Sequence, residues 1–599
     1  MTFAADSRQL QTALDFHRQG KTGEAESIYR NILAGEPEHP DALHWLGLIA
    51  YQSGNNDAAI KLIQKSIAVD AKNPLAFVDL GNAYLTVGRQ LDAEEAFRTA
   101  IELDQDIAVA WCNLGSALKS QGRFEEAKDA YNRALALDDD FVDALANLAG
   151  VLVELDQPKE AKDQCLKAIS IDPGSAISYA NLAAALIGTD DLDEAVACAR
   201  KAISLDENFS TAHQNLGEAL RILGQFSEAE TSFVRAIFLN SWNMIAYIGL
   251  SSVQFVQDRI AEAKETLNTA LQVDPAHGEA ALALGRIAVW EKNLAGFWEA
   301  YAHRWDLGKS NSFGRRYFSP PVWQGEKLTD KSLLIWGEQG IGDEILFAGL
   351  IPEISPDVSS CVLEAEPRLV QLFSRSFPDI EVVPRENPPH PNTFSLDFDF
   401  QTPSADLLRW LRPEYEGFRP LGRYLKPCPD QVAEIKRRYR SLGEGPIIGI
   451  SWHSAKSKRV NLDLWGEIFK VPGIQLVSLQ YGDRRNEIEA ANHQHEISIH
   501  YDSDVDPLSD MDTFAAQVAA MDAIVTIDNS TLAVAVALDL PTFALIPIFC
   551  DWRYLSDDTS NIWHDCLRQF QQKSPNDWAD AIAKLATEFN QFVLEQGKS

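Results

Sequence analysis

Cysteine is scarce in this sequence of 599 residues, and basic residues are outnumbered. The seven cysteines are scattered without a C-x-x-C pair, which argues against a disulfide framework or a zinc site and indicates small buried thiols. The 53 Lys and Arg stand against 87 Asp and Glu. The formal net charge of −34 therefore opposes non-specific binding to nucleic acid or to an anionic membrane surface.

Long apolar runs are also missing, and no stretch is long and uncharged enough to span a bilayer. The first residues, MTFAADSRQLQTALDF, lack the basic and apolar regions of a secretory signal. We therefore expect a cytoplasmic protein without membrane insertion. Hydrophobic residues make up 46% of the chain, as in globular proteins, and the length predicts several domains or a repeat array.

A period of 34 residues runs through the first half of the chain. Small residues recur at this step in two series, one from Gly47 to Gly285 and one from Ala25 to Ala263. The flanking apolar residues at helical spacing predict paired helices that approach closely. Segments such as AWCNLGSALKSQGRFEEAKDAYNRALALDDD (residues 110–140) resemble the tetratricopeptide repeat (TPR), with about eight units in residues 1–300. Such an α-solenoid offers an extended concave surface to a protein partner.

Asparagine stands two positions before the small residue in four consecutive units, at Asn113, Asn147, Asn181 and Asn215. An amide offers both donors and an acceptor, so a row of amides one repeat apart would clamp the peptide groups of an extended chain. Alternatively, asparagine is a permitted residue that hydrogen-bonds within its own repeat. The row resembles the ladder that lines the repeats of eukaryotic O-linked N-acetylglucosamine transferase, and this resemblance favours peptide binding.

The second half of the chain has a different pattern. After residue 300 the period is lost, and residues 301–330 have the Gly, Pro and Ser content of a connector. Beyond it, β-branched runs such as SLLIW, PIIGISW and AIVTID alternate with helical stretches, which predicts parallel strands in an α/β fold. The length fits two doubly wound halves, residues 331–428 and residues 429–599 with a C-terminal helix. In such sheets, ligands bind beyond the carboxyl ends of the strands.

A glycine-rich turn, WGEQGIGDEILFAG (residues 336–349), follows the first of these strands. It fails the P-loop template because no Lys-Ser or Lys-Thr follows, and its glycines are in the wrong order for a dinucleotide fingerprint. The turn therefore predicts a close approach of backbone and ligand, with Asp343 at the start of the next helix. This aspartate is either a stabilising charge at the helix N-terminus or a general base.

An ordered set of segments resembles the heptosyltransferase-like glycosyltransferases, whose GT-B fold has two facing Rossmann-like halves. The set comprises EQGIGDEILFAGLIP, PIIGISWHSAKSKRVNLDLWGEIF, VSLQYGD, AAMDAIVTIDNSTLAVAVALDLPTFAL, DWRYL and WHDCLRQF. The resemblance implies that Asp343 is the catalytic base, in an acceptor loop with Glu338, Gln339, Gly340 and Gly342. It also implies that a nucleotide-sugar lies against the second half, at Trp452, His453, Ser454, Lys456, Lys458, Gln480, Asp528, Asn529, Ser530 and Thr531.

The chain departs from this family after AIVTID. A histidine and a glycine that approach the donor phosphates are replaced by Ala533 and Val536. The departure implies either an inactive domain or a donor with a single phosphate, such as a CMP-linked nonulosonic acid. His453 either compensates as a cation or acid, or caps a turn. The basic cluster of Lys456, Lys458 and Arg459 either binds an anionic donor or forms a solvated loop.

The acidic run YDSDVDPLSDMD (residues 501–512) has the spacing of a calcium loop only in part. Pro507 stands where an EF-hand needs glycine, and Thr513 replaces the bidentate glutamate. We expect this run to cap the helix that begins near Asp512. Without another cluster of acids and histidines, we expect a metal-independent, inverting transfer that needs no cofactor beyond the nucleotide-sugar.

The sequence thus predicts an α-solenoid followed by an α/β GT-B domain. The expected protein captures a polypeptide and transfers a sugar to Ser or Thr, with Asp343 as the base. Its architecture resembles bacterial repeat-fused transferases, among them those that modify flagellin with pseudaminic or related nonulosonic acids. Two alternatives remain. One is a glycosyltransferase for a small molecule or lipopolysaccharide, and the other is a TPR scaffold with an inactive transferase domain.

Overall fold

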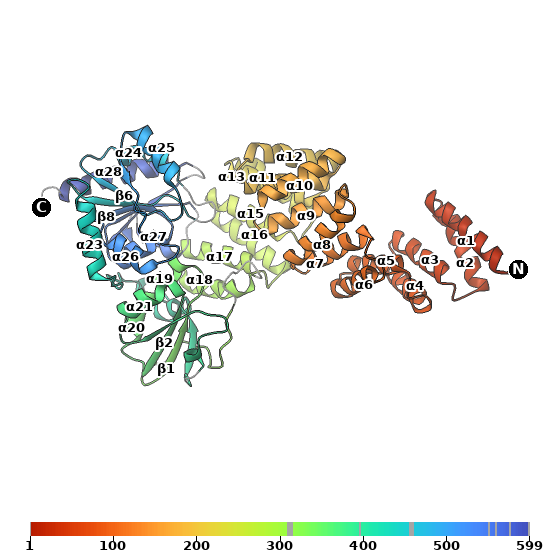
Figure 1. Ribbon diagram of the computed structural model, residues 1–599, viewed down its shortest axis with the longest axis horizontal. Coiled ribbons are helices and arrows are strands. Elements are labelled where there is room, and N and C mark those ends of the chain that lie inside the picture. Colours follow the sequence, from red (N-terminus) through yellow and green to blue (C-terminus); the bar gives the residue numbers. More distant parts are fainter. Residues whose placement is uncertain are drawn as a thin grey trace. The chain divides into compact units, whose positions relative to one another are not determined.

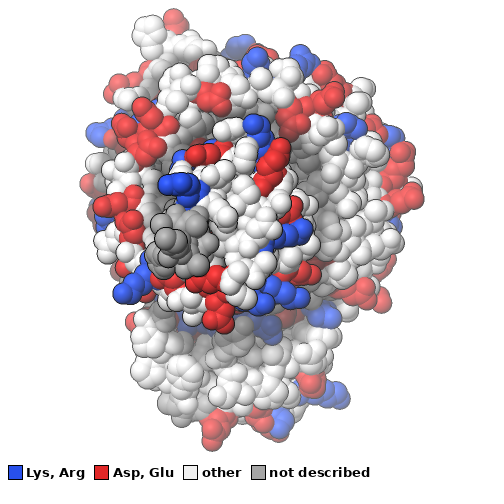
Figure 2. Space-filling view, turned by 90° about the vertical axis from the view of Figure 1, so that its right-hand side faces the viewer, with Lys and Arg blue, Asp and Glu red and all other residues white. Residues whose placement is uncertain are grey.

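The protein is described by a computed structural model, which covers residues 2–307, 315–394, 397–454, 460–548, 552–557, 560–573 and 577–596 (Figure 1). It divides into two compact units, Met1–Gly249 and Leu250–Ser599. Within the described residues, no helix is long and apolar enough to cross a membrane. On the face shown in Figure 2, Lys and Arg lie interspersed with Asp and Glu.

The first unit is an array of helix pairs. The pairs are α1 (Thr2–Arg18) with α2 (Thr22–Gly35), α3 (Pro40–Gln52) with α4 (Asn56–Val69), α5 (Pro74–Thr86) with α6 (Gln90–Leu103), α7 (Ala108–Ser120) with α8 (Phe124–Leu137), α9 (Val142–Glu154) with α10 (Pro158–Ile171), α11 (Ala176–Gly188) with α12 (Leu192–Leu205), and α13 (Ser210–Ile222) with α14 (Phe226–Leu239). The predicted repeat of paired helices is therefore confirmed.

Close packing explains why a small residue recurs in the first helix of each pair. A β-carbon on Gly81 would lie 2.5 Å from the ring of Phe97, and one on Gly115 would lie 2.7 Å from the ring of Tyr131. These aromatic residues follow the glycines by sixteen positions, on the second helix of the same pair. Where the small residue is alanine, at position 149 or 183, the residue sixteen positions later is itself small, Cys165 or Ala199. Each pair thus has its own complementary packing.

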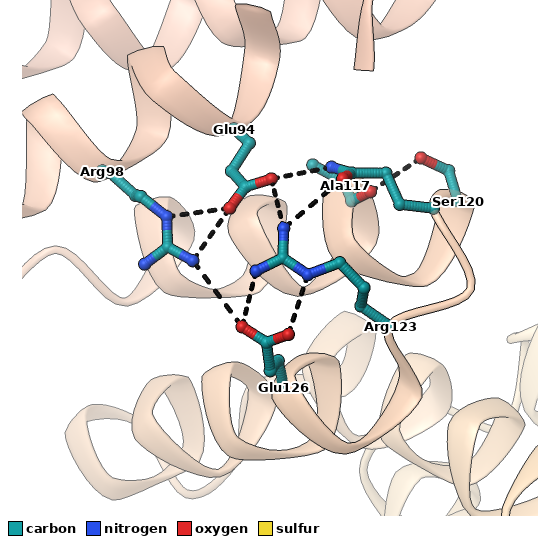
Figure 3. Close-up of polar contacts among 7 residues, drawn as sticks. Glu94, Arg98, Ala117, Ser120, Arg123 and Glu126 are labelled. Carbon is teal, nitrogen blue, oxygen red and sulfur yellow. Dashed lines mark hydrogen bonds and ion pairs between the residues drawn. The ribbon is translucent and has the colours of Figure 1, made fainter. Parts of the chain in front are cut away.

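Charged side chains connect neighbouring pairs. Glu94 of α6 accepts hydrogen bonds from Arg98 at 2.9 Å, from Gln121 at 2.9 Å and from Arg123 at 2.6 Å (Figure 3). Arg123 also binds Glu126 on α8, with its Nε donating at 2.8 Å. The loop before α8 is therefore held against the preceding pair by a network of charge-assisted hydrogen bonds.

The second unit begins with helices and continues as an α/β fold. Helix α15 (Met244–Val256) crosses the boundary and is followed by α16 (Ile260–Val273), α17 (Gly278–Trp290), α18 (Leu294–Tyr301) and the 3₁₀ helix η1 (Ala302–Asp306). Phe297 and Trp298 of α18 share one hydrophobic core with Leu333 and Ile335 of the first sheet. The sequence period ends near residue 300, but the boundary between the compact units lies at residues 249 and 250. The two positions differ because the last helices of the periodic region pack against the α/β part.

The first sheet is parallel, with strand order β3-β2-β1-β4. Its strands are β1 (Ser332–Trp336), β2 (Ser360–Ala365), β3 (Glu381–Pro384) and β4 (Phe400–Pro403), and its helices are α19 (Ile341–Ala348), α20 (Ile351–Ile354), α21 (Val370–Ser376) and α22 (Asp406–Leu411). The 3₁₀ helices are η3 (Pro367–Leu369), η4 (Pro391–Thr393) and η5 (Tyr415–Gly417). Val322 of the predicted connector adds a parallel bridge to Gln401.

The second sheet has strand order β10-β11-β12-β9-β8-β5-β6-β7, and only the β10–β11–β12 pairings are antiparallel among the described strands. Its strands are β5 (Ile447–Ile450), β6 (Gln475–Ser478), β7 (Ile499–His500), β8 (Ala523–Ile527), β9 (Thr542–Ile546), β10 (Ser556–Asp557), β11 (Ser560–Asn561) and β12 (Leu567–Gln571). Its helices are α23 (Pro429–Arg440), η6 (Leu462–Trp465), α24 (Gly466–Phe469), α25 (Arg485–His495), α26 (Met511–Ala519), α27 (Ser530–Ala537), η7 (Trp552–Tyr554) and α28 (Ala579–Gln596). The prediction of a parallel α/β region is confirmed.

In each sheet, the strand that comes first in the sequence lies inside the sheet, and the order of the later strands changes direction on its two sides. Strand β1 lies between β2 and β4, and β5 lies between β6 and β8. The six parallel strands of the second sheet follow the order of a doubly wound dinucleotide-binding fold. In such folds a crevice opens at the carboxyl ends of the strands on either side of the reversal, and ligands bind there.

Candidate functional site

The loop after β1 begins as a tight turn at the reversal point of the first sheet. The backbone N–H of Gly337 donates to the carbonyl of Glu364 at 2.7 Å, and a β-carbon on Gly337 would lie 2.6 Å from the carboxyl carbon of Glu344. Gln339 has a positive φ of 65°. The turn therefore needs glycine at position 337 because the Glu344 side chain fills the adjacent space.

Asp343 is the third residue of α19, and its carboxylate contacts Gly340 and Arg553. Its Oδ2 accepts a hydrogen bond from the backbone N–H of Gly340 at 3.3 Å, and its Oδ1 is 2.6 Å from Nη1 of Arg553. The first contact stabilises the start of the helix, as one of the two predicted roles requires. The second contact comes from η7, which belongs to the second sheet's half of the fold.

Consecutive residues of η7 contact the loops of both halves. Arg553 binds Asp343, and the hydroxyl of Tyr554 donates a hydrogen bond to Asp528 after β8. Helix α19 also packs against α27, and Figure 1 shows the two helices side by side. A β-carbon on Gly342 would lie 3.6 Å from Cα of Ser530. The structure thus brings the predicted acceptor loop and part of the predicted donor loop together.

Ala533 and Val536 are buried in this contact region. Ala533 is 2% exposed, and its methyl group would lie 3.7 Å from a β-carbon on Gly342, while Val536 is fully buried. A larger side chain at position 533 would therefore meet α19. The small residue at this position matches the close approach of the two helices.

Gln480 holds the loop after β5 with its side-chain amide. Its Oε1 accepts hydrogen bonds from the backbone N–H of Trp452 at 3.0 Å and of His453 at 2.8 Å, and from the hydroxyl of Ser451 at 3.1 Å. Its Nε2 donates to the His453 carbonyl at 3.1 Å. Gln480 therefore positions the predicted donor loop from within the fold.

Asn529 connects the same loop to the start of α27. Its Nδ2 donates to Ser451 Oγ at 2.7 Å, and its Oδ1 accepts from the backbone N–H of Leu532 at 3.2 Å. The asparagine is thus an N-cap that also connects β5 and β8 at the reversal point of the second sheet.

The remaining predicted donor residues differ in accessibility. Trp452 is 1% exposed, with Nε1 donating to Glu487 at 2.7 Å, and Thr531 is fully buried. His453, Ser454 and Ser530 are partly exposed, and a ring nitrogen of His453 lies 3.1 Å from Nη2 of Arg484. Lys456, Lys458 and Arg459 lie outside the described residues.

Glu338 and Gln339 contact α18 and η1, the helices that precede the first sheet. Arg304 of η1 donates to the Glu338 carboxylate from Nε at 2.8 Å and from Nη2 at 3.0 Å, and Nη2 also donates to Asp406 at 2.7 Å. Gln339 donates a hydrogen bond to the Tyr301 hydroxyl. Burial raises the pKa of Glu338, and the ion pair with Arg304 acts in the opposite direction. The conformation of the glycine turn therefore depends on α18 and η1.

Two further buried glutamates lie behind the turn. Burial raises the pKa of Glu344 and of Glu364 to about 7 in each case. Arg385 lies 2.6 Å from Glu344 and Arg316 lies 3.0 Å from Glu364, and both arginines oppose this increase. Sequence reasoning missed these charges, together with Arg304 and Arg553. Of these, Arg553 and Glu344 had a signal, since they stand in the matched segments DWRYL and EQGIGDEILFAGLIP.

The asparagine row joins the first helices of neighbouring pairs. Asn181 donates to the carbonyl of Ala146 at 2.7 Å, Asn215 donates to the carbonyl of Ala180 at 2.8 Å, and Asn113 donates to Oδ1 of Asn82 at 2.8 Å. Asn147 lies beside the Cys112 thiol. These bonds cross between repeats, so the expectation of bonding within one repeat is wrong for the first three. Asn215 is only 5% exposed, whereas the other three are partly exposed.

The acidic run after β7 is used within the fold. Asp502 accepts hydrogen bonds from Arg438 and, at 2.5 Å, from the Tyr439 hydroxyl. Asp510 accepts from the backbone N–H groups of Asp512 at 2.9 Å and Thr513 at 3.2 Å, so it caps α26. Throughout the described ranges, no three His, Cys, Asp or Glu side chains are grouped so that they could hold a metal ion.

Comparison with known families identifies the repeats. Residues 16–76, 76–107, 108–141, 142–175 and 176–209 match the tetratricopeptide repeat. The repeats predicted from the period of 34 residues are thus confirmed. Repeats of this kind form surfaces that bind peptides or proteins.

One similar protein is Protein FlbA of Caulobacter vibrioides, which is 32% identical over 332 residues. The match covers 52% of this chain and 54% of FlbA, so the chain spans about half the length of this relative. Among solved structures, MamA is 31% identical over 27% of this chain and 95% of its own, with a TM-score of 0.25. YrrB, described as a TPR protein with an unusual peptide-binding site, is 23% identical over 31% of this chain and 95% of its own, with a TM-score of 0.25.

Proposed function

We propose that this protein is a glycosyltransferase of the GT-B type, which captures a polypeptide through its repeats and transfers a sugar from a nucleotide-sugar to a Ser or Thr hydroxyl. One observation carries the proposal. The Asp343 carboxylate follows a glycine turn at the reversal point of one parallel sheet and contacts Arg553. The adjacent residue, Gly342, lies against Ser530 at the start of α27, at the reversal point of the other sheet. Because ligands of doubly wound folds bind at such reversal points, this proximity supports a single site shared by both sheets.

On the acceptor side, Asp343 would remove the proton from the attacking hydroxyl. The hydroxyl oxygen then forms a bond to the anomeric carbon while the bond from that carbon to the phosphate oxygen breaks. The electron pair leaves with the nucleotide, the proton stays on the Asp343 carboxylate, and direct displacement inverts the anomeric centre. The ion pair at 2.6 Å with Arg553 has to loosen before Asp343 can contact the acceptor.

On the donor side, an anionic nucleotide would compete with Asp343 for Arg553. The backbone N–H groups at the start of α27 supply a second site for phosphate, since helix N-termini favour anions. His453 lies beside this site, since Nδ2 of Asn529 is 3.4 Å from its carbonyl oxygen, and a ring nitrogen of His453 is 3.1 Å from Nη2 of Arg484. Donor binding would therefore release the base, so that an acceptor hydroxyl is activated only when a donor is present.

The proposed identities of the sugar and of the acceptor rest on resemblance alone. A donor with one phosphate, such as a CMP-linked nonulosonic acid, fits the replacement of the family's histidine by Ala533. Flagellin is the proposed acceptor because the architecture resembles the repeat-fused transferases that modify it. The repeats supply the binding surface for such a protein.

The test compares Asp343→Asn with the exposed control Asp357→Asn in cells that lack the native gene. Proteins that co-purify with the full chain are analysed by intact mass. We expect a sugar-sized mass increment on the captured protein with the wild type and the control, and none with Asp343→Asn, while capture persists in all three. An unchanged increment with Asp343→Asn would remove Asp343 as the base. Capture without any increment in the wild type would favour the scaffold alternative.

A further inference from the structure

Three residues on consecutive first helices form one diagonal across the repeats. Lys119 on α7, Gly150 on α9 and Asn181 on α11 are each separated by 31 positions, and all three are partly exposed. Side chains with this spacing touch, as the hydrogen bond of 2.8 Å between Asn113 and Asn82 shows. We refer to the surface made by these helices as the first-helix surface.

Gly150 lies between two hydrogen-bond donors. A β-carbon at this position would be 3.1 Å from Nζ of Lys119 and 3.4 Å from Nδ2 of Asn181. Because glycine has no side chain, no atom of residue 150 fills the space between Nζ of Lys119 and Nδ2 of Asn181 on the first-helix surface. The Asn181 amide uses one N–H for the Ala146 carbonyl at 2.7 Å, which leaves its second N–H for another acceptor.

Lys119 carries an ammonium group without an acceptor. Among the residues that the structure describes, none forms a hydrogen bond or an ion pair with its Nζ. Burial lowers the pKa of Lys119, and the more distant charge of Glu154 opposes this decrease. Two lysines on the second helices differ from Lys119, because Lys128 binds Gln157 at 3.0 Å and Lys162 lies 3.5 Å from Asp191. A partly desolvated ammonium without a partner is costly unless a ligand supplies one.

The neighbouring diagonals lack this pair of donors. One consists of Leu85, Ser116 and Asn147, and the other of Val153, Ala184 and Asn215. An apolar side chain stands in both places that correspond to Lys119. Lys119 is therefore flanked by apolar positions in the adjacent repeats, and the next cation at this position of the repeat, Arg221 on α13, is already paired with Glu218 at 2.6 Å. This arrangement suits a single acidic group in an otherwise neutral segment.

We propose that Lys119, Gly150 and Asn181 form a binding point for one Asp or Glu carboxylate of the captured polypeptide. The two carboxylate oxygens match the two donors, and the negative charge compensates the partly desolvated ammonium through a charge-assisted hydrogen bond. A backbone carbonyl could accept hydrogen bonds from both donors, but it carries no charge and would leave the ammonium uncompensated. The identity of the ligand as the acceptor rests on the proposed function, whereas the preference for a carboxylate rests on the site itself.

The test uses the full chain and three pools of fluorescent twelve-residue peptides. The pools share random positions drawn from Ser, Thr, Ala, Gly and Asn, and differ in one central residue, which is Asp, Asn or phosphoserine. Fluorescence anisotropy is measured for the wild type, Lys119→Met and the control Lys128→Met. We expect the wild type and the control to bind the Asp pool about tenfold more tightly than the Asn pool, and Lys119→Met to bind both equally.

Gly150→Ala provides a second variant, because it places a methyl group between the two donors. It is expected to reduce the preference for Asp, with thermal unfolding monitored to confirm that the repeats remain folded. Equal binding of the Asp and Asn pools to the wild type, absence of binding to the Asp pool, or a preference that persists in Lys119→Met would overturn the proposal. Tighter binding of the phosphoserine pool would overturn the choice of a carboxylate. No donor is present, so a failure of sugar transfer leaves this result unaffected.

Discussion

Arg553 is the single residue on which the order of events in the proposed reaction depends. It binds Asp343 at 2.6 Å, and the next residue, Tyr554, binds Asp528 at the end of β8. A guanidinium that is shared between a base and an anionic ligand would favour binding of the donor before activation of the acceptor. The pairing therefore accounts for how premature proton removal would be avoided.

We predict that Arg553→Met weakens binding of the donor nucleotide by about tenfold, because a charge-assisted contact to phosphate is lost. Asp343→Asn should bind at least as tightly as the wild type, since it removes the competing carboxylate. Calorimetric titration with CMP, UDP and GDP checks both expectations, with Arg485→Met as an exposed control. Equal affinity of Arg553→Met and the wild type, or no binding of any of the three to the wild type, would contradict the assignment.

Glu364 makes stability depend on pH. Burial raises its pKa from 4.5 to about 7, so in this range the folded protein holds a proton that the unfolded chain releases. The contribution of this group to stability therefore falls as the pH rises from about 4.5 to about 7, by at most about 1.4 kcal/mol for each unit of the shift. Arg316, at 3.0 Å, reduces this loss.

Glu364→Gln removes the titration while the side chain keeps its size. We expect the melting temperature of the wild type to fall relative to that of Glu364→Gln when the pH is raised from 5 to 8. The exposed Glu416→Gln serves as a control for general effects of pH. A difference between the wild type and Glu364→Gln that stays constant over this range would refute the prediction.

At the scale of elements, η1 and the turn after β1 form one structural unit. Arg304 is 4% exposed and Glu338 is 1% exposed, and the guanidinium also binds Asp406. The rings of Tyr301 and Trp305 lie 4.7 Å and 4.4 Å from the guanidinium carbon. A buried charge network of this kind is sensitive to the loss of one partner, since the remaining charges stay desolvated.

We expect Arg304→Met to destabilise the folded state by about 3–5 kcal/mol, because it leaves Glu338 and Asp406 without their cation. Arg304→Lys should lose less, and adding Glu338→Gln to Arg304→Met should recover part of the loss. Urea unfolding of the wild type, Arg304→Met, Glu338→Gln and the double variant completes a double-mutant cycle. Additive effects of the two substitutions would show that the pair does not interact.

At the scale of the whole molecule, two compact units with their own packing are expected to unfold separately. Differential scanning calorimetry of the full chain should show more than one transition. Gly115→Ala, which forces a methyl group to within 2.7 Å of the Tyr131 ring, should lower only the transition of the first unit. Arg304→Met should lower only that of the second. One transition shifted by both variants would contradict this expectation.

The repeats and the parallel strands could be predicted because their signals are local. Small residues at a fixed period and β-branched runs between helical stretches report packing that is decided within about 34 residues. Asp343 at the start of a helix could be predicted for the same reason. The pattern also placed the end of the array near residue 300, but it contained no sign that α18 joins the core of the first sheet.

The partners of the candidate site residues could not be predicted, because they are distant in the sequence. Arg553 reaches Asp343 across 210 positions, and Asn529 reaches Ser451 across 78. The resemblance predicted that Gln480 and Trp452 contact the donor. In the structure, the Gln480 side chain accepts hydrogen bonds from the backbone of the loop after β5, and the Trp452 side chain is buried in the core. Motif positions identify a loop, but tertiary contacts decide which of its side chains remain available.

Contacts within one repeat and contacts between repeats are affected differently when a repeat is duplicated or deleted. The complementary pairs sixteen positions apart, such as Gly115 and Tyr131, lie within one repeat and would be copied together. The diagonal of Lys119, Gly150 and Asn181 spans three repeats, so an extra repeat inserted between them would separate its members without disturbing the packing of any helix pair. During evolution the array could therefore change length without losing its fold, whereas such an insertion within this diagonal would abolish the proposed carboxylate site.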